Sequence, residues 1–173
     1  MSNAVLISIR PQWCEMIASG RKTVEVRKSC PKLETPFKCY IYCTQGEEKW
    51  LVGIIGKHPS EKLNGKVIGE FVCDNITNLF ADSRFWLDEK AVEQTRLTGD
   101  QIRAYANGKK AIYGWYISDL QIYDKPKELS EFKQCHKCPY GPIERCNEHQ
   151  FSCDGTYALS RPPQSWCYVG ELT

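Results

Sequence analysis

The sequence lacks long apolar segments and has almost no excess of charge of one sign. No apolar run approaches the ~18 residues that a membrane-spanning helix needs, and the first one, VLISI at 5–9, is short and has no basic segment before it. The net charge is only +2, which excludes the strongly basic proteins that coat nucleic acid without regard to sequence. We therefore expect a cytoplasmic protein with no export signal and no membrane partner, in which a local patch makes any contact with nucleic acid.

The chain is also too short for two ordinary domains with separate cores. Its 173 residues, of which 42% are apolar and 12% aromatic, match the size and composition of one domain with one core. We predict a single domain over 1–173. A cysteine-rich segment at 130–162 is poor in periodic apolar residues, so we expect it to be an insertion before the last strand.

Short alternating or apolar runs are the most frequent pattern in the chain. They predict strands at 5–9, 23–27, 38–44, 50–57, 66–76, 111–124 and 165–172. Apolar residues at helical spacing predict helices at 12–19, near 88–95 and at 99–107, the last with a capping box from Thr98 to Gln101. Because strands outnumber helices and do not alternate with them, we predict an α+β, mainly β fold, a small and mostly antiparallel β-barrel flanked by short helices.

The stretch SIRPQWCEMIASGRKTVEVRK, residues 8–28, gathers groups that could hold a ligand. Glu25 and Arg27 are two apart on a strand and so share one face, and Lys22 follows the turn at Gly20. Such a carboxylate can accept hydrogen bonds from a base edge, while the guanidinium binds phosphate. The alternative is a surface ion pair between Glu25 and Arg27, worth ~0–1 kcal/mol, with the nearby tryptophan in the core.

Three more residues complete this candidate ligand site. Arg10 adds positive charge at the end of the first strand, and Trp13 and Trp166 offer flat surfaces on which a base could stack.

The sequence resembles the ASCH domains of the PUA-like superfamily. The motif I-R-P-x-W followed by I-x-x-G-x-K-T-x-E-x-R is similar to the opening of these domains, and AIYGWYISDLQIYDKP to their penultimate strand. PPQSWCYV resembles the closing strand of a bacterial, often phage-associated branch. The resemblance covers most of 4–125 and 162–172. It implies a β-barrel flanked by helices that binds RNA or a modified nucleoside in a cleft beside the first helix.

The resemblance also raises the question of catalysis. Some ASCH domains hydrolyse an acetyl group from acetylated cytidine, and in those a threonine nucleophile stands where this chain has Glu25. Lys22 is retained, and Glu25 could still act as a general base on water, so these two are the catalytic candidates. Glu70 is a further candidate to face the cleft. The leading hypothesis is a binding module. A hydrolase acting on a modified nucleoside or on RNA, and a protein-interaction module, are the alternatives.

The ten cysteines fall into two groups. Cys14, Cys30, Cys39, Cys43, Cys73 and Cys167 lie in strand-like or helix-like runs, and we expect them to be small core residues.

The other four have the spacing C-x2-C-x7-C-x6-C, at Cys135, Cys138, Cys146 and Cys153. This spacing predicts one structural zinc ion in a segment that has little else to bury. His149 could replace one of these cysteines, whereas we expect His136 to be exposed. A redox C-x-x-C pair and disulfides formed after purification are the alternatives, and a protein partner could bind this zinc knuckle.

Overall fold

A curved six-stranded sheet is the centre of the computed structural model, which describes residues 3–46, 63–80, 87–135 and 156–172. The strand order is β2-β5-β4-β3-β1-β8. The strands are β1 Asn3–Ile9, β2 Val24–Arg27, β3 Phe37–Cys43, β4 Val67–Asn78, β5 Tyr113–Lys127 and β8 Trp166–Gly170. These match six of the predicted strands, and the seventh, at 50–57, lies outside the described residues.

The described strand pairs are antiparallel except for one. β1 and β3 are parallel, with Val5 opposite Cys39, whereas β1–β8, β2–β5, β3–β4 and β4–β5 are antiparallel. Among the described strands, β2 and β8 each have one neighbour, so the described part of the sheet is a curved half-barrel with two edges. The prediction of a mainly β, mostly antiparallel fold is confirmed.

Three short helices flank the sheet, at the predicted places. They are α1 Pro11–Ala18, α2 Glu89–Thr95 and α3 Gly99–Ala106. The capping box of α3 is present: the amide of Gln101 donates to the Thr98 hydroxyl at 3.2 Å, and the amide of Thr98 donates to the Gln101 side chain at 2.8 Å. No helix in the described part of the chain is long and apolar enough to cross a bilayer.

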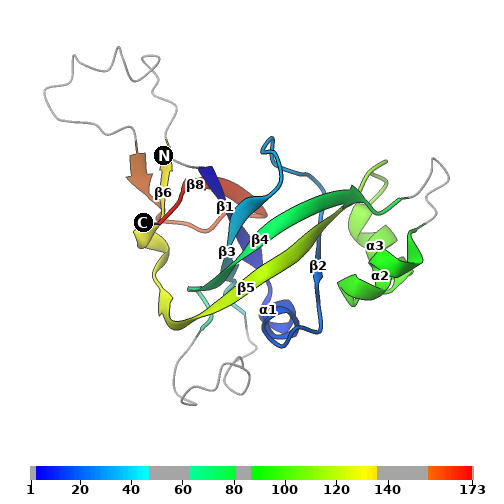
Figure 1. Cartoon of the computed structure of the whole chain (residues 1–173), viewed down its shortest axis with the longest axis horizontal. Coiled ribbons are helices and arrows are strands. Elements are labelled where there is room, and N and C mark those ends of the chain that lie inside the picture. Colours follow the sequence, from blue (N-terminus) through cyan, green and yellow to red (C-terminus); the bar gives the residue numbers. More distant parts are fainter. Residues whose placement is uncertain (1–2, 47–62, 81–86, 136–155, 173) are drawn as a thin grey trace, which may run out of the picture.

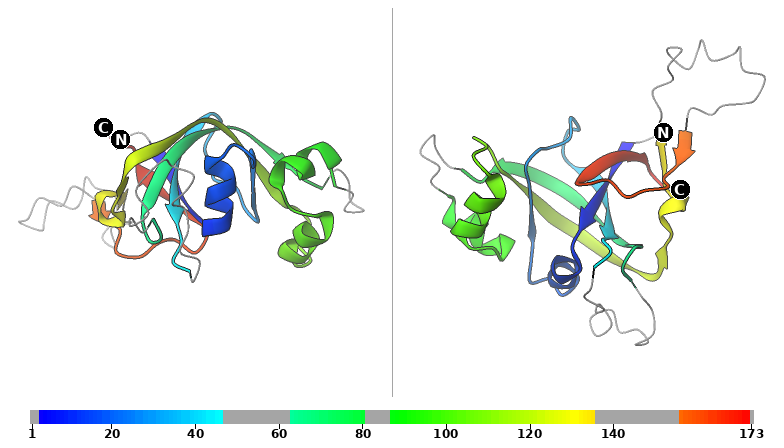
Figure 2. Two further views of the ribbon diagram at one scale, coloured as in Figure 1. Left: turned by 90° about the horizontal axis from the view of Figure 1, so that it is seen from below. Right: turned by 180° about the vertical axis from the view of Figure 1, so that it is seen from behind.

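The helices lie at different places on the half-barrel (Figures 1 and 2). The long strands β4 and β5 arch over α1, and α2 and α3 lie together at one end of this arch. At the other end, the 3-10 turn η1 Leu129–Glu131 leads to a small ribbon of β6 Lys133–Cys135 and β7 Thr156–Ala158. This ribbon was not predicted, because each of its strands is only three residues long.

Strand β2 separates two kinds of environment. Val26 packs against the helices α2 and α3, in a cluster that includes Leu79, Ala91 and Ile102. Glu25 and Arg27 point to the opposite face, as the alternation of a strand requires. That face belongs to the interior of the half-barrel, since Glu25 pairs with the fully buried Trp115 of β5.

Most of the cysteines outside the 135–153 segment are core residues, as predicted. Cys14, Cys39, Cys43 and Cys73 are buried and Cys167 is partly buried. Cys30 is a correction to that prediction, because it is exposed in the loop that follows β2. The strand ends at Arg27, so the alternation that would bury a cysteine does not extend to residue 30.

Candidate functional site

Glu25 is shared by two cations inside the half-barrel. Its Oε2 lies 3.3 Å from the Lys22 ammonium, and its Oε1 lies 3.0 Å from NH1 of Arg27. The three side chains are only 2%, 6% and 10% exposed for Lys22, Glu25 and Arg27. The three predicted residues are therefore brought together, and the alternative of a weak surface pair between Glu25 and Arg27 is wrong. We call these residues the charged trio.

Lys22 uses all three of its protons within the protein. Besides its ion pair with Glu25, the ammonium donates to the carbonyls of Val24 at 2.8 Å and Thr95 at 2.7 Å. Burial lowers the pKa of Lys22, and the attraction of Glu25 opposes this change. Because Thr95 ends α2, Lys22 ties this helix to the start of β2.

Arg27 is less completely satisfied. Its NH2 donates to the carbonyl of Ser8 at 2.6 Å and its NH1 makes a longer contact of 3.5 Å to the carbonyl of Val26. Its Nε is buried and has no acceptor in the described part of the chain, and the same is true of Nε1 of Trp115. The two residues are diagonal neighbours, because Arg27 pairs with Tyr113 and Glu25 with Trp115. Within the ranges that the structure describes, two donors on one interior face therefore have no hydrogen-bond acceptor.

The charges of the trio do not balance. One carboxylate faces both the guanidinium of Arg27 and an ammonium held by three acceptors. Positive charge is therefore in excess where water is largely excluded, and electrostatic attraction is stronger there than at an exposed surface. The arrangement favours an oxygen-rich or anionic partner.

Aromatic rings connect the trio to the surface. The ring centre of Trp13 lies 5.3 Å from the Lys22 ammonium, and Trp115 lies 5.9 Å from Trp166, ring centre to ring centre. Both Trp13 and Trp166 are partly exposed, and Arg10 is exposed. Trp166 is oriented by a hydrogen bond from its Nε1 to the hydroxyl of Ser29 at 3.1 Å. These three predicted residues thus lie near the molecular surface, while the trio is buried.

Sequence reasoning missed three residues that shape this site. Ser8 and Thr95 contribute backbone carbonyls, for which a sequence carries no signal. Trp115 could have been found, because strand alternation on β5 places it on the same face as Tyr113, but its partner strand was not known.

Glu70 does not belong to this site, which corrects the expectation that it faces the cleft. Its cross-strand neighbour is Tyr40, which packs in a second cluster on the other face of the sheet. Glu70 accepts a hydrogen bond from the Tyr123 hydroxyl and forms an ion pair with Lys38 at 3.0 Å. Burial, followed by the hydrogen bond to Glu70, raises the pKa of Tyr123.

Only one of the four predicted zinc ligands lies within the described residues. Cys135 ends β6, while Cys138, Cys146 and Cys153 lie outside the described residues, as does His149. Within the described ranges, no group of three or more histidine, cysteine, aspartate or glutamate side chains could hold a metal ion.

Comparison with solved structures identifies the fold. The crystal structure of ASCH from Zymomonas mobilis superposes with a TM-score of 0.60 and 20% sequence identity, over 97% of this chain and 88% of that one. A tyrosine-to-phenylalanine mutant of the same Zymomonas mobilis protein superposes with a TM-score of 0.58, also at 20% identity, over 97% of this chain and 91% of that one. No family model matches the sequence, and no curated protein does. The likeness establishes that this chain has an ASCH-type fold, as the sequence motifs implied.

Proposed function

We propose that this protein, with its ASCH-type fold, is a binding module for RNA or a modified nucleoside, and that the ligand binds beside α1. The observation that carries the proposal is a pair of buried donors, Arg27 Nε and Trp115 Nε1, that have no acceptor among the described residues. A buried donor left unpaired costs about 1–3 kcal/mol. An oxygen atom of a ligand that accepts from these groups would recover that cost, and it would also meet the excess positive charge of the trio.

The surroundings of the trio match the chemistry of a nucleobase. Trp13 and Trp166 are partly exposed, and stacking of a base on an aromatic side chain contributes about 1–3 kcal/mol. Arg10, exposed at the start of α1, can neutralise a phosphate. We therefore assign stacking to the tryptophans, base-edge recognition to the interior donors and phosphate attraction to Arg10.

Trp115→Phe is the sharpest test of this function, because it removes an unpaired donor and keeps an aromatic ring. We expect binding of a fluorescent single-stranded RNA of about ten nucleotides to weaken several-fold, while urea unfolding shows a folded protein. Arg10→Ala should also weaken binding. The slope of the logarithm of affinity against the logarithm of salt concentration should become shallower by the release of about one counterion. Lys125→Ala, an exposed lysine at the far end of β5, is the control. Absence of binding by the unaltered protein to RNA and to free nucleosides at low salt would refute the proposal.

The arrangement favours binding over hydrolysis. Both oxygens of Glu25 are occupied by cations, so this carboxylate is poorly placed to take a proton from water. The ammonium of Lys22 has no proton left for a substrate. We expect the unaltered protein to release little or no acetate from acetylated cytidine when product is measured by chromatography. Glu25→Thr introduces the hydroxyl that the hydrolysing ASCH domains carry at this position, and we expect it to install some activity. Rapid turnover by the unaltered protein would contradict this expectation.

We also propose the structural zinc ion that the cysteine spacing predicts. In the β6–β7 ribbon, Cys135 lies opposite Thr156, so the two ends of the cysteine-rich segment are held next to each other. A ribbon that joins the ends shortens the loop that a metal must close, which lowers the entropic cost of binding.

A further inference from the structure

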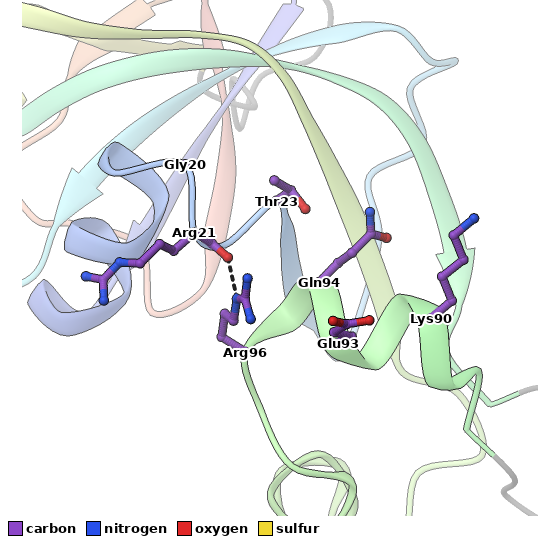
Figure 3. A pocket seen from close by; sticks show the side chains of 7 residues that line it. All are labelled: Gly20, Arg21, Thr23, Lys90, Glu93, Gln94 and Arg96. Atoms are coloured by element: carbon purple, nitrogen blue, oxygen red, sulfur yellow. Dashed lines mark hydrogen bonds between the residues drawn. The ribbon is translucent and has the colours of Figure 1, made fainter.

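A cavity lined mainly by charged and polar residues lies beside the turn that contains Lys22. It occupies about 280 Å³ between the turn that joins α1 to β2 and the exposed side of α2 (Figure 3). The turn contributes Gly20, Arg21 and Thr23. The helix and its end contribute Lys90, Glu93, Gln94 and Arg96.

Several charged side chains around this cavity have donors or acceptors that no other described residue uses. Arg96 donates from its Nε to the carbonyl of Arg21, which fixes the guanidinium, and its two terminal nitrogens have no partner among the described residues. In the described part of the chain, Lys90 and Glu93 form no ion pair, although both are exposed. The cavity thus offers two cations and one carboxylate to a ligand.

The cavity and the charged trio share a wall. Lys22 lies between Arg21 and Thr23 in the sequence, and its ammonium donates to the carbonyl of Thr95, the residue between Gln94 and Arg96. A further hydrogen bond, from the amide of Thr23 to the carbonyl of Gln94 at 3.1 Å, closes this wall. Lys22 and Thr95, which meet at the charged trio, are therefore each flanked in the sequence by residues that line the cavity.

We propose that this cavity holds the ribose and phosphate of a nucleotide that flanks the one bound at the charged trio. The inference rests on the proposed function and extends it to a substrate class, a single-stranded RNA rather than an isolated nucleoside. Arg96 and Lys90 bind the phosphate, since a guanidinium and an ammonium are the usual protein partners of phosphate oxygens. The volume, near the lower end of the range for ligand pockets, suits one sugar–phosphate unit.

Glu93 decides between ribose and deoxyribose. A carboxylate beside two cations would repel a bare phosphate, but it accepts a hydrogen bond from a hydroxyl group. The 2′-hydroxyl is the group by which a protein distinguishes RNA from DNA at a given position. We therefore assign Glu93 to the 2′-hydroxyl, which gives the cavity a preference for RNA.

The test compares three ligands: a fluorescent single-stranded RNA of about ten nucleotides, DNA of the same sequence and a free nucleoside. Lys90→Ala is the main variant, because its side chain makes no ion pair in the described part of the protein and its loss leaves the fold intact. We expect RNA affinity to fall about 5- to 10-fold, with a salt dependence shallower by about one counterion. Binding of the free nucleoside should not change. Lys125→Ala is the matched control.

Glu93→Gln tests the ribose contact separately. We expect the preference for RNA over DNA to fall about 5-fold or more, which corresponds to the loss of one charge-assisted hydrogen bond. Arg96→Lys, which keeps the charge but loses the planar fork, should weaken RNA binding while the protein stays folded. If the unaltered protein binds RNA and Lys90→Ala and Glu93→Gln bind as it does, the cavity has no such role and only this inference fails. If the unaltered protein binds no RNA, the proposed function fails with it.

Discussion

At the scale of single residues, the buried carboxylate of Glu25 is the group on which the charged trio depends. It is the partner of both Lys22 and Arg27. Removing one member of a buried ion pair costs about 3–5 kcal/mol, because the remaining charge stays buried without a partner. Removal of the Glu25 carboxylate would leave two such buried charges, those of Lys22 and Arg27.

We therefore predict that Glu25→Gln lowers the free energy of unfolding by about 3 kcal/mol or more. The exposed pair of Glu15 and Arg21, with side chains 40% and 54% exposed, provides the control. Glu15→Gln should change stability by less than about 1 kcal/mol. Urea unfolding followed by tryptophan fluorescence measures both, and equal effects of the two substitutions would contradict the prediction.

The buried thiols give a second prediction at this scale. Burial raises the pKa of Cys73 to about 12 and that of Cys167 to about 11, from an ordinary value of 9.0. In the unfolded chain these thiols lose their protons near pH 9, while the folded protein keeps them. The unfolded state then binds fewer protons, so stability is full below pH 9 and is lost as pH rises toward 12.

Cys73→Ala should make this alkaline loss of stability less steep. Each thiol that is protonated only in the folded state contributes about 1.4 kcal/mol per pH unit to the slope. Unfolding in urea at several pH values between 8 and about 10.5 measures this slope of the free energy of unfolding against pH. Cys30→Ala is the matched control, since Cys30 is exposed. A slope that Cys73→Ala leaves unchanged would show that this thiol does not control it.

At the scale of elements, the side chain of Lys22 ties the end of α2 to the turn before β2. The last carbonyls of a helix have no partner within it, and the ammonium of Lys22 satisfies that of Thr95. α2 has only seven residues, so such an external contact carries much of its stability.

We predict that Lys22→Met, which keeps the length of the side chain, loosens α2 more than the sheet. Amide hydrogen exchange of residues 91–97 should accelerate at least 10-fold, whereas β3 and β4 should change little, because they pack with α1 in the main core. Lys109→Met, an exposed lysine beyond α3, is the control. Exchange that accelerates equally in α2 and in β3 would mean that Lys22 supports the whole fold instead.

At the scale of the whole molecule, the zinc proposal predicts that residues 133–160 can lose their structure while the sheet stays folded. One zinc ion should bind per chain, and elemental analysis of freshly purified, reduced protein measures it. Four protein ligands leave no open position for water, so the ion should support structure rather than catalysis. Chelation of the metal should accelerate hydrogen exchange in 133–160 and leave β1, β3 and β4 protected. These strands are held by an apolar core that their own side chains form.

Cys138→Ser tests the same proposal without a chelator. It removes one ligand of the C-x-x-C pair with little change in volume, and we expect metal content to fall well below one ion per chain. Cys167→Ser, outside the predicted ligand set, should keep the ion. Metal content near zero in the unaltered, reduced protein would rule the zinc site out.

The order of strands along the chain could be predicted, but their neighbours in the sheet could not. Alternation locates β2 and the face shared by Glu25 and Arg27. It does not indicate that β2 pairs with β5, some ninety residues later in the sequence, so the burial of that face and the contribution of Trp115 were missed. Glu70 was misplaced for a related reason: irregularities on both sides of it, between Val67 and Gly69 and between Glu70 and Val72, interrupt the alternation on which a prediction from sequence depends.

The position of β2 at the edge of the sheet has a consequence for how the protein is made. Among the described strands β2 pairs only with β5, so a nascent chain that stops before residue 113 carries Glu25 and Arg27 with no strand to join. Formation of this site must wait for a contact of long sequence separation, which is slow compared with local structure. If the proposed function holds, the site is complete only on chains whose synthesis has also passed β8, because Trp166 belongs to that strand.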